Sequence, residues 1–356
     1  PKGQYFEVKK VYQNVDVRGV KPEEGIIEIF NKNYFTDLSG YDIRWSLYAD
    51  GQPVEALSNQ PLSSTRLTLG ARERQTYQLD FKGYAFDPAK EYFLKVQFLQ
   101  AEKKPWAEKG YVQMEEQIAV KPAAAQPAMA SVAKGRVAAP VVEGNLLRVK
   151  GQGYELTFDK NTGGLYAATY NGATVIEPGH GPRLDAFRAR TDNDNWMDAK
   201  WPKLGLHNLH HKTLAFAQNV TKEGNLQLIF TVESQAPYGG VDNYSNRDRD
   251  KDEVYKIVDD KSKPFGPNDF KFTTHQIYTI YADGSVELES AISSNMPKAK
   301  LPRLGYAFEM PKDYRNFTYY GRGPVNNYAD RKTGQFIERH QGVVGEQDIM
   351  LPKPQS

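Results

Sequence analysis

Residues 275–290 have the sequence His-Gln-Ile-Tyr-Thr-Ile-Tyr-Ala-Asp-Gly-Ser-Val-Glu-Leu-Glu-Ser, and this stretch decides the class of fold. Two segments that favour β-strands, 275–281 and 286–290, are separated by the turn-forming sequence Ala-Asp-Gly-Ser. This pattern is typical of a β-hairpin, in which a short loop joins two antiparallel strands. It is the clearest hairpin signal in the sequence, and helical periodicity is nearly absent elsewhere.

The same signature extends from this hairpin over the rest of the chain. Short runs rich in aromatic and β-branched residues are bounded by Gly, Asn, Asp and Pro. Over residues 41–48 the alternation places Ile43, Trp45 and Leu47 on one face of a strand. Asp50–Gly51 then favours a tight turn, because both residues tolerate a positive φ. Further strands are predicted at residues 25–32, 74–81, 91–99, 110–120, 146–149, 154–158 and 165–170.

The spacing of these strands predicts two all-β domains. About seven short strands within residues 1–120 predict an immunoglobulin-like β-sandwich. Residues 144–356 are too many for such a sandwich, and their long antiparallel strands predict a large double-sheet sandwich. Residues 121–140 contain eight Ala and three Pro, which predicts a linker over residues 121–143. A surface helix is the alternative, but the prolines would interrupt it.

Composition and charge exclude several classes of protein. The chain has 356 residues, with 46 Lys and Arg against 44 Asp and Glu, a net charge of +2 and no cysteine. Without a basic stripe, nucleic acid is not expected as a partner. No run of about 18 apolar residues is present that could form a transmembrane helix. The absence of cysteine excludes disulfides, thiolate nucleophiles and thiolate metal sites. The first residues, Pro-Lys-Gly, are neither an initiator Met nor a signal peptide, so we expect the sequence to begin within a longer protein.

Three polar clusters are candidates for binding. The loop 190–195 contains Asp192, Asn193 and Asp194, whose oxygens could bind a hard cation or sugar hydroxyls; an Asx-rich turn is the alternative. His207 and His211 have the i,i+4 spacing of two metal ligands on one helical face, but no third ligand can be placed, and solvated histidines are the default interpretation. The charged stretch 242–253 predicts a surface insertion within a hairpin rather than a cation site.

The segment 320–331, Tyr-Gly-Arg-Gly-Pro-Val-Asn-Asn-Tyr-Ala-Asp-Arg, mixes turn-forming residues with charged ones. Gly321 and Gly323 indicate an unusual φ or the close approach of another backbone, and no helical pattern follows them that would indicate a nucleotide site. We expect this segment to form hydrogen bonds across a domain boundary. The motifs of serine hydrolases, zinc proteases, phosphate loops and dinucleotide-binding folds are absent. A catalytic pair of carboxylates would leave no spacing rule in such a sequence.

Several short motifs follow one another along nearly the whole chain. They are Tyr-Phe-Glu-Val-Lys-Lys-Val-Tyr-Gln at 5–13, Asn-Lys-Asn-Tyr-Phe-Thr-Asp-Leu at 31–38, Trp-Ser-Leu-Tyr-Ala-Asp-Gly at 45–51, Trp-Ala-Glu-Lys-Gly-Tyr at 106–111, Gly-Pro-Arg-Leu-Asp-Ala-Phe-Arg-Ala-Arg-Thr-Asp-Asn-Asp at 181–194, Leu-Pro-Arg-Leu-Gly at 301–305, and the segment 320–331. As a set they resemble the C-terminal β-domains of the large glycoside hydrolase family 2 β-galactosidases.

This resemblance implies a fold and a function. It implies an immunoglobulin-like fourth domain over residues 1–120 and, over residues 144–356, a galactose-mutarotase-like supersandwich that is incomplete at its C-terminus. The chain would be a non-catalytic part of an enzyme that hydrolyses terminal β-D-galactosides with retention, through two Glu residues of a catalytic barrel. That barrel would precede residue 1 and hold the family's Mg²⁺ and Na⁺, so no catalytic residue, metal ligand or cofactor is assigned to this chain.

The resemblance also provides candidate site residues and partners. Asp192, Asn193 and Asp194 are candidates for the rim of the galactose pocket. The candidates for a seam between domains are Arg190, Arg322, Asn327, Tyr328, Asp330 and Arg331. The expected partners are the catalytic barrel of the same polypeptide, β-galactosides bound by the whole enzyme, and further copies in a homo-oligomeric parent. The compartment is left open, with a periplasmic or other extracytoplasmic location slightly favoured over the cytoplasm.

A second hypothesis is an autonomous carbohydrate-binding or mutarotase-like module. A mutarotase needs a general acid and a general base across a pyranose, and His180, His275 or His340 with a Glu could supply them. Saturable binding of galactose or lactose by the chain alone would favour this hypothesis.

Overall fold

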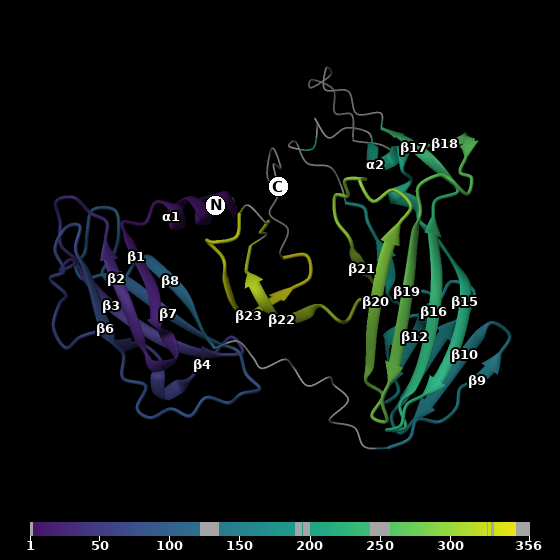
Figure 1. Ribbon diagram of the computed structural model, residues 1–356, viewed down its shortest axis with the longest axis horizontal. Coiled ribbons are helices and arrows are strands. Elements are labelled where there is room, and N and C mark those ends of the chain that lie inside the picture. The colour runs from purple at the N-terminus through teal and green to yellow at the C-terminus, as the bar shows by residue number, and fades with distance from the viewer. Residues whose placement is uncertain are drawn as a thin grey trace. The chain divides into compact units, whose positions relative to one another are not determined.

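A computed structural model describes residues 3–121, 135–188, 194, 200–242, 257–325, 327–328 and 331–346. The chain forms two compact units (Figure 1): unit 1 consists of Pro1–Gln126 and Arg315–Leu351, and unit 2 of Pro127–Tyr314 and Pro352–Ser356. The prediction of an all-β chain is confirmed. In the described residues, strands alternate with loops, two α-helices, α1 (Gly3–Val11) and α2 (Lys200–Lys203), and the short 3₁₀ helices η1 (Pro22–Glu24), η2 (Glu55–Leu57) and η5 (Leu206–Asn208).

The described residues of unit 1 form two larger antiparallel sheets and a separate two-stranded one. One has the order β1–β2–β6, formed by β1 (Val15–Lys21), β2 (Ile26–Asn31) and β6 (Arg74–Gln78). The other has the order β4–β3–β7–β8, with β5 paired to β3; its strands are β3 (Tyr41–Ala49), β4 (Gln52–Pro53), β5 (Gln60–Pro61), β7 (Tyr92–Gln100) and β8 (Val112–Lys121). β2, β3, β6, β7 and β8 overlap strands that the sequence predicts, whereas β1 and β5 were not predicted.

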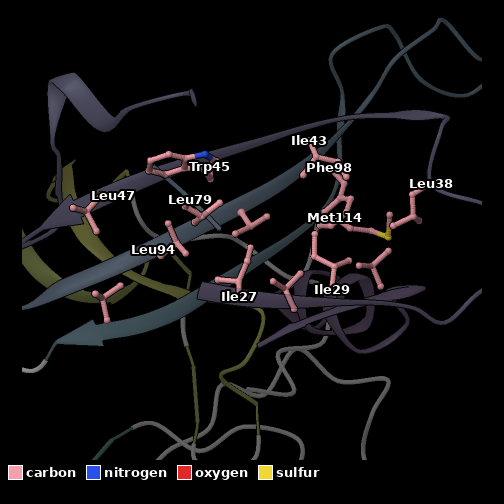
Figure 2. Packing of buried hydrophobic residues seen from close by; sticks show 14 of the residues in the cluster. Ile27, Ile29, Leu38, Ile43, Trp45, Leu47, Leu79, Leu94, Phe98 and Met114 are labelled. Carbon is pink, nitrogen blue, oxygen red and sulfur yellow. The ribbon is translucent and has the colours of Figure 1, made fainter. Parts of the chain in front are cut away.

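The two sheets of unit 1 enclose one apolar core (Figure 2). Ile27 and Ile29 point into it from β2, and Trp45, Leu94 and Met114 contribute from the second sheet. The face predicted for residues 41–48 is buried as expected, because every second side chain of a strand points to the same side. Burial of this face fixes the register of β3, since a slip by one residue would expose all of it.

The turn after β3 has the backbone that its sequence predicts. Asp50 has a φ of 46° and Gly51 a φ of 75°, the two positive angles of the tight turn that matches the twist of a hairpin. The returning strand, β4, is only two residues long. The chain then continues through η2 to β5, which also pairs with β3.

A hairpin from the far end of the described chain completes unit 1. Its strands are β22 (Asn316–Gly323) and β23 (Phe336–Val343), with Tyr319 opposite His340. The sequence prediction included these residues in a domain over 144–356, whereas they pack with residues of the first 126. The bounds of the domains otherwise stay a prediction.

Unit 2 contains two larger antiparallel sheets. The first has the order β13–β12–β11–β10–β9, with β9 (Val141–Glu143), β10 (Leu146–Gly151), β11 (Tyr154–Asp159), β12 (Gly164–Tyr170) and β13 (Ala173–Ile176). The second has the order β15–β16–β19–β20, with β15 (His210–Val220), β16 (Leu226–Gln235), β19 (Phe272–Ile280) and β20 (Val286–Ser294). The predicted hairpin at 275–290 is the β19–β20 pair, and both strands extend beyond the predicted residues.

Both sheets of unit 2 contribute to a shared core, as expected of a double-sheet sandwich. Leu156 and Phe158 come from β11, and Phe230 and Tyr278 from the second sheet. A smaller core lies around Trp201, Leu206 and Phe272. It supports the short pair of β14 (Arg183–Asp185) and β21 (Gly305–Ala307).

The predicted linker and the predicted charged insertion lie partly outside the described residues. Of the predicted linker 121–143, Lys121 is the last residue of β8, and residues 135–143 belong to unit 2, where Val137 is buried and β9 joins the first sheet. Most of the charged stretch 242–253 is outside the described residues, but its flanking strands, β17 (Tyr238–Asp242) and β18 (Ile257–Pro264), form an antiparallel pair. In the described part of the chain, no helix has the length and apolarity to cross a membrane.

Candidate functional site

The acidic loop after β14 is anchored by an arginine. Of its candidates, Arg190, Asp192 and Asn193 lie outside the described residues, and Asp194 is described and buried. Arg188 donates to both carboxylate oxygens of Asp194, over 2.6 and 3.0 Å. This two-bonded geometry is the strongest form of an arginine–carboxylate pair.

The same arginine lies over an aromatic ring. The guanidinium carbon of Arg188 is 5.4 Å from the centroid of the Trp201 ring, within the range of a cation–π contact. The indole of Trp201 is buried and donates to the carbonyl of Lys300 over 3.0 Å. Arg188 therefore contacts α2 through Trp201, and Trp201 in turn is bonded to the segment before β21.

A second carboxylate at this end of unit 2 is also paired. Asp185 accepts a hydrogen bond from the backbone N–H of Phe187 over 2.9 Å and forms an ion pair with Arg303. Asp185 lies opposite Gly305 in the β14–β21 register. Two of the motifs quoted from the sequence, 181–194 and 301–305, are thus brought side by side by this strand pair.

The three neighbouring histidines do not form a helical pair of metal ligands, the alternative that their spacing had left open. His207 lies in η5, and His210 and His211 begin β15. The Nε2 of His207 is 2.7 Å from a carboxylate oxygen of Asp259, and the Nδ1 of His211 is 2.8 Å from the hydroxyl of Ser234. The default interpretation of solvated rings is wrong for His207 and His211, because the side chain of His207 is only 12% exposed and the ring of His211 is largely buried beside Ser234.

Burial has a direct electrostatic effect on His211. Burial lowers the pKa of its imidazole to about 4, and the charges of Arg183 and His210 act in the same direction. The ring is therefore neutral at neutral pH. Among the described residues, no three His, Asp or Glu side chains are grouped so that they could hold a metal ion.

The histidines considered for mutarotase chemistry are dispersed. His180 pairs through Nδ1 with the carboxylate of Glu309, over 2.9 Å, near the surface of unit 2. His275 is exposed on β19. His340 belongs to unit 1, where its ring lies 5.0 Å from that of Tyr319. Of the three, His180 has the acid partner that the hypothesis requires, but the two groups bond to each other.

Unit 2 has a cavity of about 350 Å³, and some of the residues that line it are close to His180 in the sequence. It is lined by Ala173, Thr174, Glu177, Pro311, Asp313 and Tyr314. An aromatic ring beside carboxylates is a combination that can contact a sugar, through the apolar face of the pyranose and its hydroxyls. No sequence motif pointed to this cavity, because its lining comes from β13 and from a loop more than 130 residues later.

The described seam candidates shape the loop between β22 and β23. Arg322 donates to the carbonyls of Lys332 and Gln335 over 3.0 and 2.6 Å. Asn327 donates to the carbonyl of Arg322 over 3.3 Å. Tyr328 and Arg331 form a short bridge, with the guanidinium carbon 5.2 Å from the ring centroid. Asp330 lies outside the described residues.

The hairpin itself is held on unit 1 mainly by polar contacts. Lys95 of β7 forms an ion pair with Glu338 over 2.6 Å. Burial alone would lower the pKa of Lys95, but the hydrogen bond and charge of Glu338 raise it above its usual value. The side chain of Gln117 both donates to and accepts from the backbone of Ile337, each over 2.9 Å. Sequence reasoning missed these partners, because each lies more than 200 residues from the hairpin.

Besides its place in the turn, Gly51 lies against the backbone of β23, so a substitution of Gly51 tests the contact between this turn and the hairpin. A Cβ at Gly51 would lie 2.5 Å from the backbone nitrogen of Arg339. We expect Gly51→Ala to cost about 1–2 kcal/mol for its positive φ and about 1–3 kcal/mol more for the clash with β23. The matched control is Gly110→Ala, because Gly110 has a φ of 82° and open space around its Cβ. Denaturant unfolding measures both costs, and equal costs would contradict a close contact with β23.

Comparison with known proteins identifies two families along the chain. The profile of the family described as "Beta galactosidase small chain" matches residues 150–356, and that of "Beta-galactosidase, domain 4" matches residues 27–121. The chain belongs to the beta-galactosidase small chain family. The resemblance stated from the sequence motifs is thus confirmed.

Curated relatives of this small-chain family member are named Beta-galactosidase. The protein from Priestia megaterium is 28% identical over 355 residues, which are 98% of this chain and 30% of the relative. The protein from Halalkalibacterium halodurans is 25% identical over 94% of this chain and 29% of the relative, and that from Streptococcus thermophilus is 24% identical over 95% and 28%. The chain therefore spans about 30% of the length of the curated relatives it matches.

Proposed function

We propose that the chain is a non-catalytic part of a retaining β-galactosidase of glycoside hydrolase family 2, which cleaves terminal β-D-galactosides with residues outside 1–356. The observation that carries this proposal is the coverage of the relatives. Proteins named Beta-galactosidase match nearly all of this chain, while the match spans about 30% of their own length. The remaining length of such an enzyme would hold the catalytic carboxylates.

The described carboxylates of the candidate site support a structural role. A retaining glycosidase needs two carboxyl groups about 5–5.5 Å apart, one of which is protonated before the reaction. Asp194 and Asp185 are each paired with an arginine, and an arginine partner favours the ionised carboxylate. They are suited to hold loops in place, rather than to donate a proton.

Several finer features belong to this proposal. The acidic loop 192–194 would form part of the rim of the galactose pocket, positioned by the Arg188–Asp194 pair. The loop around Arg322 and Asn327 would serve assembly with the rest of the enzyme. The family's Mg²⁺ and Na⁺ would bind to residues outside this chain, and the whole enzyme could form homo-oligomers.

Hydrolysis of a chromogenic β-galactoside tests the proposal. We expect no turnover by the purified 356-residue chain, and turnover by a longer polypeptide that contains the preceding barrel. Turnover by the short chain that depends on its own carboxylates would place an acid and a nucleophile within residues 1–356 and overturn the proposal.

The cavity beside Tyr314 favours one alternative, a carbohydrate-binding module. If this alternative holds, galactose or lactose should bind saturably to the short chain, and Tyr314→Ala should weaken binding at least tenfold through loss of the stacking ring. Calorimetry with millimolar sugar measures this, and no binding at that concentration would exclude the alternative.

A further inference from the structure

Polar side chains of β19 are buried between the two cores of unit 2. Thr274, Gln276 and Tyr278 share the inner face of the strand and are 0%, 4% and 1% exposed. The ring of Tyr278 belongs to the larger core, and Phe272, at the start of the strand, belongs to the smaller one. Polar groups buried in such a place are stable only when each has a hydrogen-bond partner.

The neighbours of Gln276 fix the orientation of its amide. The amide nitrogen donates to the hydroxyl oxygen of Thr274 over 3.2 Å, and that hydroxyl donates to the carbonyl of Val232 over 3.4 Å. Burial raises the pKa of the Tyr306 hydroxyl, and contact with Gln276 opposes this shift, as expected when the amide N–H donates to it. Both amide hydrogens are therefore in use. The amide oxygen Oε1 is buried and has no donor among the described residues.

Tyr278 has the complementary deficit. The hydrogen of its buried hydroxyl has no acceptor in the described part of the chain. The backbone N–H of Leu165, which lies beside the oxygen, is itself a donor and cannot take this hydrogen. Burial raises the pKa of Tyr278 above its usual value, so the hydroxyl keeps its hydrogen. One buried group thus needs an acceptor, and Gln276 needs a donor.

Both groups lie beside the same glycine of the facing sheet. A Cβ on Gly164 of β12 would lie 2.8 Å from the Tyr278 oxygen and 3.6 Å from Oε1 of Gln276. Gly164 has a φ of 132°, which favours glycine, so β12 places no side chain against these oxygens. Buried polar groups without a protein partner are the usual binding sites of internal water molecules.

We infer that one internal water molecule binds between Tyr278 and Gln276, beside Gly164. The water accepts the hydrogen of the Tyr278 hydroxyl and donates one of its own hydrogens to Oε1 of Gln276. Internal waters make about three hydrogen bonds each, so one more partner is expected from the backbone nearby. Through Gln276 the water is connected to Tyr306, which lies on β21 opposite Leu184 of β14. The site therefore belongs to the support of the strand pair from which the acidic loop leaves.

A crystal structure of the 356-residue chain, at a resolution that shows ordered waters, tests the inference. We expect one water at about 2.6–3.2 Å from both the Tyr278 oxygen and Oε1 of Gln276. A direct hydrogen bond between these two side chains would overturn the inference, and so would an ordered structure with no water in contact with both.

Magnetic relaxation dispersion of water provides a second measurement, because it counts the long-lived internal waters of a protein in solution. In the double variant Tyr278→Phe with Gln276→Leu, which removes both partners, we expect the count to fall by about one. Tyr314→Phe is the control, since that side chain is 42% exposed and its hydroxyl can bond to solvent; its count should equal that of the wild type. An unchanged count in a folded double variant would contradict the site. If the double variant does not fold, the wild-type crystal structure decides.

Discussion

Replacement of Asp194 with alanine is expected to lower the free energy of unfolding of unit 2 by about 3 kcal/mol or more. The change removes both hydrogen bonds that the carboxylate accepts from Arg188. The guanidinium of Arg188 is partly buried, and without the carboxylate nothing offsets the free-energy cost of its desolvation. The loss of stability is therefore larger than the net contribution of the ion pair. The stacking of Arg188 on Trp201 should weaken with it, because the carboxylate holds the guanidinium in place.

Denaturant unfolding followed by tryptophan fluorescence measures this effect. Asp194→Asn is the matched control, because it keeps the size of the side chain and one acceptor oxygen and should cost only about 1–2 kcal/mol. In the double variant Arg188→Met with Asp194→Leu, much of the loss should be recovered, as with other ion pairs replaced by apolar residues. A cost of Asp194→Ala within about 0.5 kcal/mol of zero, the usual range for surface substitutions, would contradict an anchoring role.

Acid is expected to destabilise unit 2 through His211. In the unfolded chain the imidazole gains a proton near pH 6.5, its ordinary pKa, whereas in the folded unit burial delays protonation to about pH 4. Between these values the unfolded state binds more protons, so stability rises with pH. The contribution is complete above about pH 6.5 and is lost as the pH falls toward 4, with a total of about 3 kcal/mol.

His211→Asn isolates this contribution, because asparagine cannot take up a proton and can still bond to Ser234. We expect the free energy of unfolding of the variant to fall less than that of the wild type between pH 7 and pH 4.5. His275→Asn is the control for the substitution itself, since that side chain is exposed on β19 and its replacement leaves the surroundings of His211 intact. Equal pH dependence of the His211 variant and the wild type would show that the ring is solvated in the folded unit.

The features that the sequence predicts well are those set by neighbouring residues. The Asp50–Gly51 turn and the β19–β20 hairpin follow from turn chemistry and from alternation within about ten residues. The motifs at 181–194 and 301–305 indicated a family, but only the β14–β21 pairing shows that they meet. That pairing depends on contacts between distant segments, which local patterns do not encode.

The errors have the same origin. His207 and His211 have helical spacing, but His211 lies in β15, whose pairing with β16 overrides that local preference, and His207 lies in the separate turn η5. Lys95 and Gln117 looked like ordinary polar positions of strands, and their partners on β23 could not be found by spacing. Helix α1 was not predicted, because a helix of nine residues leaves only a short periodic signal in the sequence.

The discontinuous make-up of unit 1 has a consequence for its biosynthesis. The hairpin that completes it cannot form until residues 122–314 have been translated, which at about 5–20 residues per second takes on the order of 10–40 s. Throughout that interval, the surface that will receive the hairpin is open to water and to chaperones. This surface presents the side chains of Lys95 and Gln117 and the backbone of Gly51. Before β23 arrives, water and ions can satisfy the hydrogen bonds and the charge of these groups. We therefore expect the surface that receives β22 and β23 to be polar during synthesis and to resist aggregation until these strands are made.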